Sequence, residues 1–235
     1  MTELNDDFFR HISSEFNEEL EVLRRSVLEM GGLVEEQLIS ALKFFKTNDS
    51  SVLSAIEENE QKINGAEIDL DDQVESLIVR RQPIASDLRL VLAVSKIVRD
   101  LERMGDELEK VGRLSLDSFS SNDSVGITEI ERIAEQVRKM VSEALTAFAK
   151  LDLELAREIF EREREVDKIY QSALRVLATF MIEDPRNIGT VLNIVWIARS
   201  LERVGDHATN IAEYVIYMIQ GIDIRHPAVN QNKLD

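Results

Sequence analysis

The sequence contains no cysteine, and it has only 3 prolines and 9 glycines among its 235 residues. The absence of cysteine excludes disulfides, thiolate metal sites and thiol nucleophiles, and it is compatible with a protein of the cytoplasm. Proline and glycine interrupt regular structure, so their scarcity favours long helices over a turn-rich β fold. Because hydrophobic residues make up 44% of the chain, we expect a packed core rather than a disordered acidic protein.

Positive charge is also scarce, since 28 lysines and arginines stand against 45 aspartates and glutamates, giving a net charge of −17. Proteins that bind duplex DNA or RNA neutralise phosphates with clustered lysine and arginine, so we expect no direct binding of nucleic acid. The longest apolar stretches, Leu90–Val94 and Val191–Ala198, are far shorter than the ~20 residues of a membrane span. The acidic start, Met1–Asp7, is followed by no apolar core, which argues against a signal peptide. We therefore expect a cytoplasmic protein without membrane insertion.

Apolar residues that recur at intervals of three or four predict an all-α fold with six long helices. The first helix carries an apolar stripe from Leu20 to Phe45. The other five are expected from Ser51 to Arg81, Ser86 to Ser118, Thr128 to Lys150, Asp152 to Ile182 and Pro185 to Gly221. The residues expected to cap these helices are Asp49 with its neighbours in 47–51, Ser86, Asp152, Asp184 before Pro185, and Thr128 paired with Glu131 in a capping box.

The two halves of the chain repeat each other. Leu101–Asp106 (Leu-Glu-Arg-Met-Gly-Asp) returns 100 residues later as Leu201–Asp206 (Leu-Glu-Arg-Val-Gly-Asp), and Val34…Asp49 matches Val137…Asp152 at an offset of 103. The repeat predicts two tandem three-helix bundles related by an approximate internal two-fold repeat. The expected units are residues 1–118, a linker at 119–126, residues 127–221, and a flexible tail at 222–235.

Acidic residues within this repeat are paired four positions apart, which places both members of a pair on one face of a helix. The pairs are Glu102 with Asp106, Glu202 with Asp206, Glu163 with Asp167 and, in a reduced form, Glu60 with Asn64. Like charges at this spacing repel, and Gly105 and Gly205 each cost about 1 kcal/mol relative to alanine in a helix interior. Glycine allows close backbone approach, and paired carboxylates suit a hard cation, which favours Mg, Mn or oxidised Fe over Zn.

Other interpretations of these residues remain open. An acidic pair at helical spacing is usually a solvated face, and Arg103 and Arg203 can pair with neighbouring acids. His207 can bind a metal or accept a phosphoryl group, although a lone helical histidine is more often a surface or satisfied core residue. We interpret Trp196 as a core residue, and the acidic run Glu67–Asp72 as a solvated helix edge.

Several motifs together resemble the PhoU family of phosphate-transport-system accessory proteins. They are Arg80-Arg-Gln-Pro83, Ser86-Asp-Leu-Arg89, Asp100–Asp106, Glu183-Asp-Pro185, Leu201–Ala208 and Asn210-Ile-Ala212. The similarity covers the chain from about His11 to His226. The resemblance implies two tandem three-helix bundles and multinuclear metal binding, with iron or zinc in some members. The ligands carried over by position are Glu60, Glu102, Asp106, Glu163, Asp167, Glu202 and Asp206, whereas Asn64 departs from the motif.

The resemblance also implies a function. It indicates a cytoplasmic, dimeric regulator that restrains the phosphate-starvation response by bridging the ATPase of the phosphate ABC transporter and a sensor histidine kinase. The resemblance therefore predicts a homodimer without enzymatic activity. Two further functions stay open, namely a metal-dependent enzyme on a helical bundle and a regulator of another phosphate permease. A purely structural bundle without a site is the third alternative.

Overall fold

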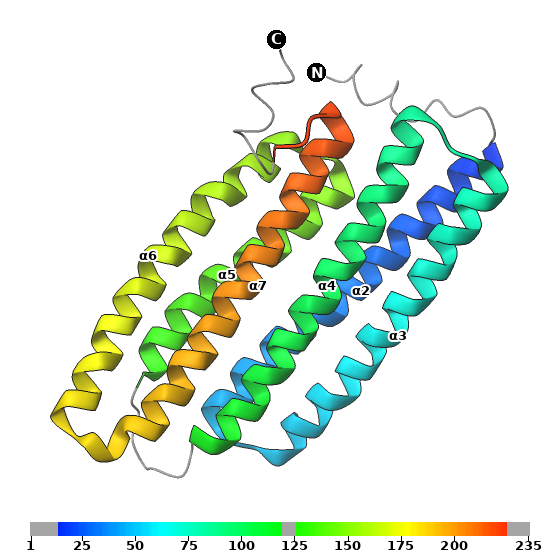
Figure 1. Ribbon diagram of the computed structural model, residues 1–235. Helices are drawn as coiled ribbons and strands as arrows, with labels where there is room; N and C mark the ends of the chain where they lie inside the picture. Colours follow the sequence, from blue (N-terminus) through cyan, green and yellow to red (C-terminus); the bar gives the residue numbers. More distant parts are fainter. Residues whose placement is uncertain (1–13, 119–125, 225–235) are drawn as a thin grey trace.

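The computed structural model describes residues 14–118 and 126–224, and these residues form long helices without any strand (Figure 1). The helices are α2 (Ser14–Thr47), α3 (Ser50–Arg81), α4 (Ala85–Ser118), α5 (Ile127–Lys150), α6 (Leu153–Glu183) and α7 (Ile188–Gln220), with a 3₁₀ turn, η1 (Pro185–Asn187). The all-α prediction is confirmed. Residues 119–125 of the expected linker at 119–126, and most of the expected tail, lie outside the described residues.

Three of the predicted helix caps are confirmed. The carboxylate of Asp49 accepts a hydrogen bond from the backbone N–H of Ser51 (3.0 Å) at the start of α3. Asp152 caps α6 by accepting from two backbone N–H groups. Asp184 accepts from the backbone N–H of Arg186 (3.0 Å), although the helix begins there with the 3₁₀ turn η1. Each cap satisfies N–H groups that have no partner within the helix.

The capping box predicted at Thr128 and Glu131 is wrong. The residue before α5 is Gly126, in the left-handed region with φ 73°, and no side chain caps the helix. Thr128 lies inside α5, and Glu131 instead forms an ion pair with Lys46 of α2 (2.8 Å). Ser86 also lies within its helix, because α4 begins at Ala85. At α4 and α5 the capping pattern in the sequence therefore does not mark where the helix begins.

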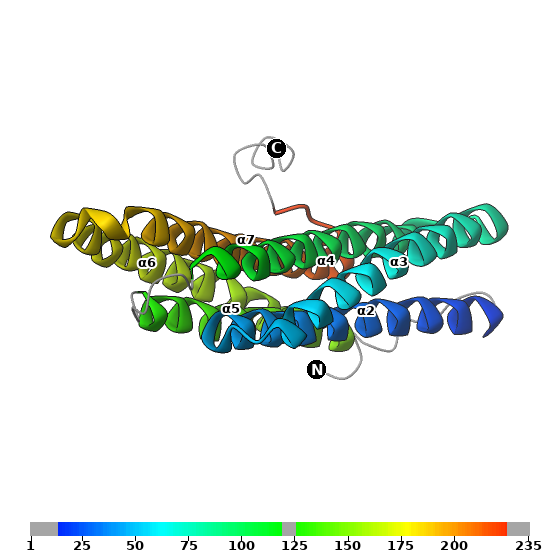
Figure 2. The same ribbon diagram turned by 90° about the horizontal axis from the view of Figure 1, so that it is seen from below.

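The six helices pack as one body with an internal symmetry. Seen from below, α4 and α7 lie side by side in one layer and α2 and α5 in a second, with α3 and α6 on opposite sides of this centre (Figure 2). The contact between α4 and α7 is the most extensive between any two helices in the described part. Each helix of the first half therefore lies in a setting that its counterpart in the second half repeats.

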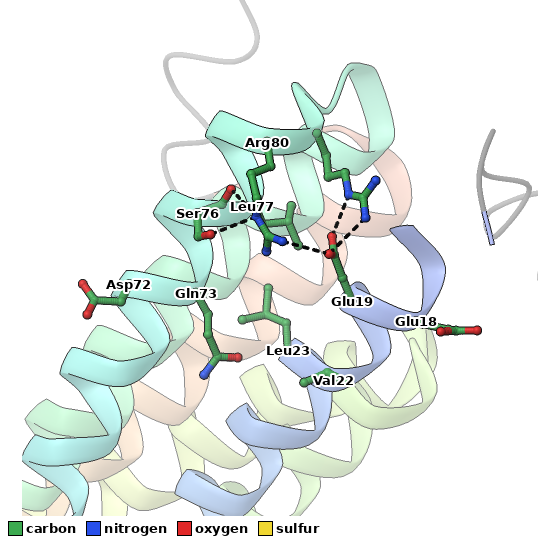
Figure 3. A pocket seen from close by; sticks show the side chains of 10 residues that line it. Glu18, Glu19, Val22, Leu23, Asp72, Gln73, Ser76, Leu77 and Arg80 are labelled. Carbon is green, nitrogen blue, oxygen red and sulfur yellow. Dashed lines mark hydrogen bonds and ion pairs between the residues drawn. The ribbon is translucent and has the colours of Figure 1, made fainter. Parts of the chain in front are cut away.

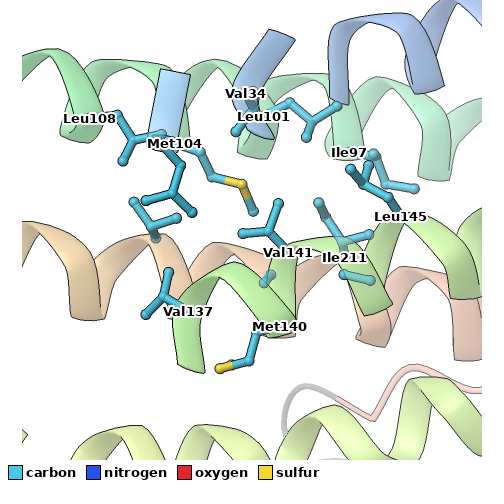
Figure 4. Close-up of a cluster of buried hydrophobic side chains, with 14 of the residues drawn as sticks. Val34, Ile97, Leu101, Met104, Leu108, Val137, Met140, Val141, Leu145 and Ile211 are labelled. Carbon is cyan, nitrogen blue, oxygen red and sulfur yellow. The ribbon is translucent and has the colours of Figure 1, made fainter. Parts of the chain in front are cut away.

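The hydrophobic core is continuous across the two halves. Leu101 and Met104 of α4 and Val34 of α2 face Val137 and Val141 of α5 in one buried cluster (Figure 4). Helix α2 packs especially closely on α5 at Gly31, where an added Cβ would lie 2.5 Å from a methyl carbon of Leu145. The halves are thus joined by core packing.

One apolar side chain does not lie where we expected it. Trp196 of α7 is 54% exposed, so its assignment to the core is wrong. Ile188 and Leu192, which precede it by two turns and one turn, are also exposed. The three side chains form a row along the outer face of α7. No helix in the described part is both long enough and apolar enough to cross a bilayer.

Candidate functional site

The first-half acidic cluster forms where α3 lies beside α4. Glu60 of α3 is only 5% exposed, and its Oε2 accepts a hydrogen bond from Nε2 of Gln37 (2.6 Å), whereas its Oε1 is buried without a hydrogen-bond partner. Burial raises the pKa of Glu60 against the opposing effect of the Gln37 hydrogen bond. The carboxylates of Asp106, Glu109 and Glu102 raise it further. Glu60, Glu102 and Asp106 therefore influence one another across the contact between α3 and α4.

Gly105 allows this close packing of α3 on α4. A Cβ at position 105 would lie 2.9 Å from Oε2 of Glu60, and the Gly105 carbonyl accepts a second hydrogen bond from Gln37 (3.0 Å). The expected close approach is confirmed at Gly105. It is wrong at Gly205, where an added Cβ would meet nothing nearer than Met140 at 3.7 Å. The two equivalent glycines thus have different packing roles.

Alanine at these glycines should have different effects on stability. Gly205→Ala is expected to raise the free energy of unfolding by about 0.5–1 kcal/mol, because alanine is the better helix former and the site has room. The free energy of unfolding of Gly105→Ala should be about 1–3 kcal/mol lower than that of Gly205→Ala, because the new Cβ must displace the buried Glu60 carboxylate. Urea denaturation of both variants measures the difference. Equal effects at the two positions would contradict the packing difference.

Two members of the first-half set lie toward solvent. The side chains of Asn64 and Asp106 are exposed, and Asp106 is 48% accessible. Arg103 lies between Glu102 and Asp106, with nitrogen–oxygen distances of 3.6 and 3.8 Å. The predicted pairing of Arg103 with neighbouring acids is therefore confirmed, although both distances are longer than a charge-assisted hydrogen bond. Arg203 differs, because it pairs with Glu107 of α4, in the other half of the chain (2.8 Å).

The four acids of the second-half cluster influence one another where α6 lies beside α7. Glu202 is 8% exposed; one of its oxygens pairs with Arg199, and the other, Oε2, is buried without a hydrogen-bond partner. Burial raises the pKa of Glu202 to about 7, and the carboxylates of Asp206 and Asp167 contribute to this rise. Burial also raises the pKa of Glu163, with further contributions from Asp206 and Asp167.

Stability of the metal-free chain should fall as pH rises from about 5 to about 8. The folded chain keeps a proton on Glu202 up to about pH 7, whereas the unfolded chain releases it near the ordinary pKa of 4.5. The folded state therefore binds more protons in this window, and its stability is lost as pH rises through it, by roughly 1–3 kcal/mol. Burial shifts the pKa values of Glu60, Glu102 and Glu163 in the same direction.

Urea denaturation across that pH range, with EDTA present, measures this loss. Glu202→Gln keeps the shape of the side chain and cannot ionise, so this variant should lose much less stability over the same range. A control variant, Glu161→Gln, changes an exposed acid on α6 and should follow the wild type. Stability that is constant or rises with pH in the wild type would show that Glu202 ionises normally.

The chemistry of these clusters fits a hard metal ion. Each of the two clusters contains one buried carboxylate oxygen that lacks a hydrogen-bond partner, Oε1 of Glu60 and Oε2 of Glu202. The surrounding donors are carboxylates, which Mg, Mn and Fe accept. Within residues 14–118 and 126–224, no three Asp, Glu or His side chains already converge as a metal-binding group. The fit therefore rests on donor chemistry and burial, and the carboxylates must turn to coordinate an ion.

Sequence reasoning missed two residues of the first-half site. Gln37 of α2 anchors Glu60, and its own Oε1 accepts a hydrogen bond from Asn59 (3.1 Å). Glu67 was interpreted as part of a solvated edge, but it is half-buried, and burial raises its pKa. Glu67 lies seven residues after Glu60, so the two share one face of α3. That spacing was the available signal for Glu67, whereas nothing in the sequence marks Gln37.

His207 connects the two halves. Its Nδ1 lies 2.7 Å from Oδ1 of Asp100 on α4, and Asn210 donates to the same oxygen (2.9 Å). The interpretation of His207 as a satisfied residue is confirmed by this contact. Together with the ion pair between Arg203 and Glu107, it places a polar network along the boundary between α4 and α7.

A pocket lies at one end of the bundle, between the start of α2 and the end of α3 (Figure 3). Its volume is about 820 Å³, and it contains both arginines of the Arg80-Arg-Gln-Pro83 motif. Arg81 makes two hydrogen bonds to Glu19 (2.9 and 3.1 Å), and Arg80 lies 3.3 Å from the same carboxylate. Glu19 therefore compensates the positive charge of this pocket.

Comparison with known proteins gives consistent matches over nearly the whole chain. A family model described as the PhoU domain matches residues 27–123 and again residues 130–215. A phosphate-specific transport system accessory protein PhoU homolog of Pseudomonas aeruginosa is 47% identical, over 97% of this chain and 95% of its own length. The phosphate-specific transport system accessory protein PhoU of Escherichia coli K12 is 38% identical, over 96% and 93%.

Solved structures agree with these matches. The crystal structure of PhoU from Pseudomonas aeruginosa superposes with a TM-score of 0.85 at 48% identity, covering 88% of this chain and all of the other. The phosphate transport system regulatory protein PhoU from Streptococcus pneumoniae superposes with a TM-score of 0.82 at 25% identity, covering 89% and 99%. Two matches of one family model, one in each half, fit the internal repeat.

Proposed function

Because the chain belongs to the PhoU family of phosphate-transport accessory proteins, we propose that it is a cytoplasmic negative regulator of phosphate uptake and of the phosphate-starvation response. The observation that carries this proposal is the match of the PhoU domain to both halves of the chain. The names of the relatives, transport accessory and regulatory proteins, point to a non-enzyme. The chain's role is therefore to act on other proteins of phosphate transport.

The partners that we propose are the ATPase of the phosphate ABC transporter and a sensor histidine kinase. Supporting features are long helices with accessible faces, among them the row of Ile188, Leu192 and Trp196 along α7. Apolar side chains exposed at one-turn intervals are suited to docking against another protein. A homodimer is part of the same proposal. The net charge of −17 supports an effect on transcription that passes through protein partners.

Metal binding is also part of the proposed function. We assign Fe, Zn, Mg or Mn to the two acidic clusters, with Glu60, Glu102 and Asp106 as ligands in the first half. The ligands in the second half are Glu163, Asp167, Glu202 and Asp206, and Asn64 is the weak member of the set because its side chain is exposed and uncharged. The cations would supply the charge that these partly buried carboxylates lack. Their role would be to stabilise the helix pairs rather than to carry out a reaction.

Affinity purification from cells grown in excess phosphate tests the partners. The tagged chain should retain the transporter ATPase and the kinase, and it should retain less of both from phosphate-starved cells. A matched purification from cells that express the tag alone gives the background. Retention of neither partner in excess phosphate would contradict the proposal.

A further inference from the structure

A second pocket, of about 400 Å³, lies on the boundary between α4 and α7. Its lining residues are Lys96, Arg99, Asp100 and Arg103 from α4, and His207 and Tyr214 from α7. Three permanent cations thus gather around one pocket, although acids outnumber bases by 45 to 28 in the chain. This concentration of positive charge needs a reason, because like charges repel when nothing lies between them.

The cations of this pocket are available to a ligand. The ammonium of Lys96 lies 5.6 and 5.9 Å from the ring centres of Tyr214 and Tyr217, which holds the side chain in place without neutralising it. In the described part of the chain, neither Lys96 nor Arg99 forms an ion pair within 4.0 Å. The guanidinium nitrogens of Arg103 lie 3.6 Å from a carboxylate oxygen of Glu102 and 3.8 Å from one of Asp106. Both distances are longer than a charge-assisted hydrogen bond of about 2.7–2.9 Å.

The acid of the pocket is already engaged. Asp100 is buried, and its Oδ1 contacts both His207 (2.7 Å) and Asn210 (2.9 Å). Glu102 and Glu67 are the other acids near these arginines: burial raises the pKa of each, and Arg99 and Arg103 offset this rise only in part. An anion in the pocket would therefore meet three cations that are only partly compensated by these acids.

The second copy of the repeat provides an internal comparison. The residues 100 positions after Lys96, Arg99 and Arg103 are Trp196, Arg199 and Arg203. Trp196 has no charge, Arg199 pairs with Glu202, and Arg203 pairs with Glu107 (2.8 Å). The incompletely compensated positive charge is thus a property of one copy and is not a by-product of the duplication.

We infer that the pocket between α4 and α7 binds a tetrahedral oxyanion, with inorganic phosphate as the ligand. The inference of an anion site is drawn from the positions of Lys96, Arg99 and Arg103, whereas the choice of phosphate among oxyanions rests on the proposed function. A guanidinium donates two parallel hydrogen bonds to phosphate oxygens, and an ammonium adds a point charge. Because α7 contributes His207 and Tyr214 to the same pocket, bound phosphate lies on the contact that joins the two halves.

Calorimetric titration of the purified full-length chain with inorganic phosphate tests this inference, with EDTA present so that no metal binds phosphate. The wild type should bind phosphate saturably. The double variant Lys96→Gln with Arg99→Gln should bind phosphate at least about tenfold more weakly, because each substitution removes a charged hydrogen-bond donor. Arg103→Gln, at an exposed position, is a second variant in case the first does not fold.

A matched control removes two positive charges elsewhere. The control variant carries Arg157→Gln and Arg164→Gln on α6, where each arginine pairs with an acid one turn away. Its affinity for phosphate should stay within about twofold of the wild type. Absence of saturable binding by the wild type, or equal affinity in the pocket variants, would overturn the inference. So would tighter binding of a phosphoserine peptide than of free phosphate. None of these results would change the retention of protein partners, which tests the proposed function separately.

Discussion

Replacing Glu202 and Asp206 by alanine is expected to lower the metal affinity of the second-half cluster by at least about 100-fold. Changes to residues that only support metal ligands already cost about 10–100-fold, and these two carboxylates are proposed as ligands themselves. Glu202 is the strongest candidate, because its Oε2 is buried without a partner and its pKa is raised to about 7. Elemental analysis after native purification, followed by metal titration, measures the loss.

The chain offers a matched control for this experiment. Glu161 and Glu165 are also acids four positions apart on α6, but both are exposed. Glu161→Ala with Glu165→Ala should therefore keep the metal content of the wild type. Metal content that stays unchanged in the Glu202→Ala and Asp206→Ala variant would show that the ligands are assigned wrongly.

Thermal stability provides a second measurement on the same proteins. Removing a bound cation leaves partly desolvated carboxylates that repel each other, so a chelator should lower the thermal midpoint of the wild type. The variant without Glu202 and Asp206 should respond less, because only its first-half cluster keeps the full set of carboxylates. A wild-type midpoint that does not respond to the chelator would show that metal does not stabilise the fold.

Much of the fold was predictable because its causes are local or repeated. Apolar residues at helical spacing mark the six helices, and Asp49 and Asp152 mark two of the starts because their carboxylates suit orphan N–H groups. The acidic clusters were predictable for a different reason. The pairs recur in both copies of a three-helix unit, and antiparallel neighbours in such a unit bring them together.

The remaining features depend on how the helices rotate and pack. The partner of Arg203 is Glu107, 96 positions away, and no sequence pattern connects them. Trp196 stands in an apolar run of its helix, yet it lies on the outer face because α4, α5 and α6 cover other sides of α7. Gln37 is polar on the buried side of α2, and only the approach of Glu60 and Gly105 explains its position.

Loss of the chain is expected to release the phosphate-starvation response while phosphate is plentiful. A regulator that restrains the kinase through protein contacts leaves the kinase in its active state when it is absent. Starvation transcripts and phosphate uptake should then stay high in excess phosphate. Expression of the intact chain from a plasmid should restore repression, which separates this effect from damage to neighbouring genes.

The most direct measurement is therefore the level of phosphate-starvation transcripts in a deletion strain grown in excess phosphate. The proposed function predicts transcript levels close to those of starved wild-type cells. Transcript levels as low as those of the wild type in excess phosphate would contradict it.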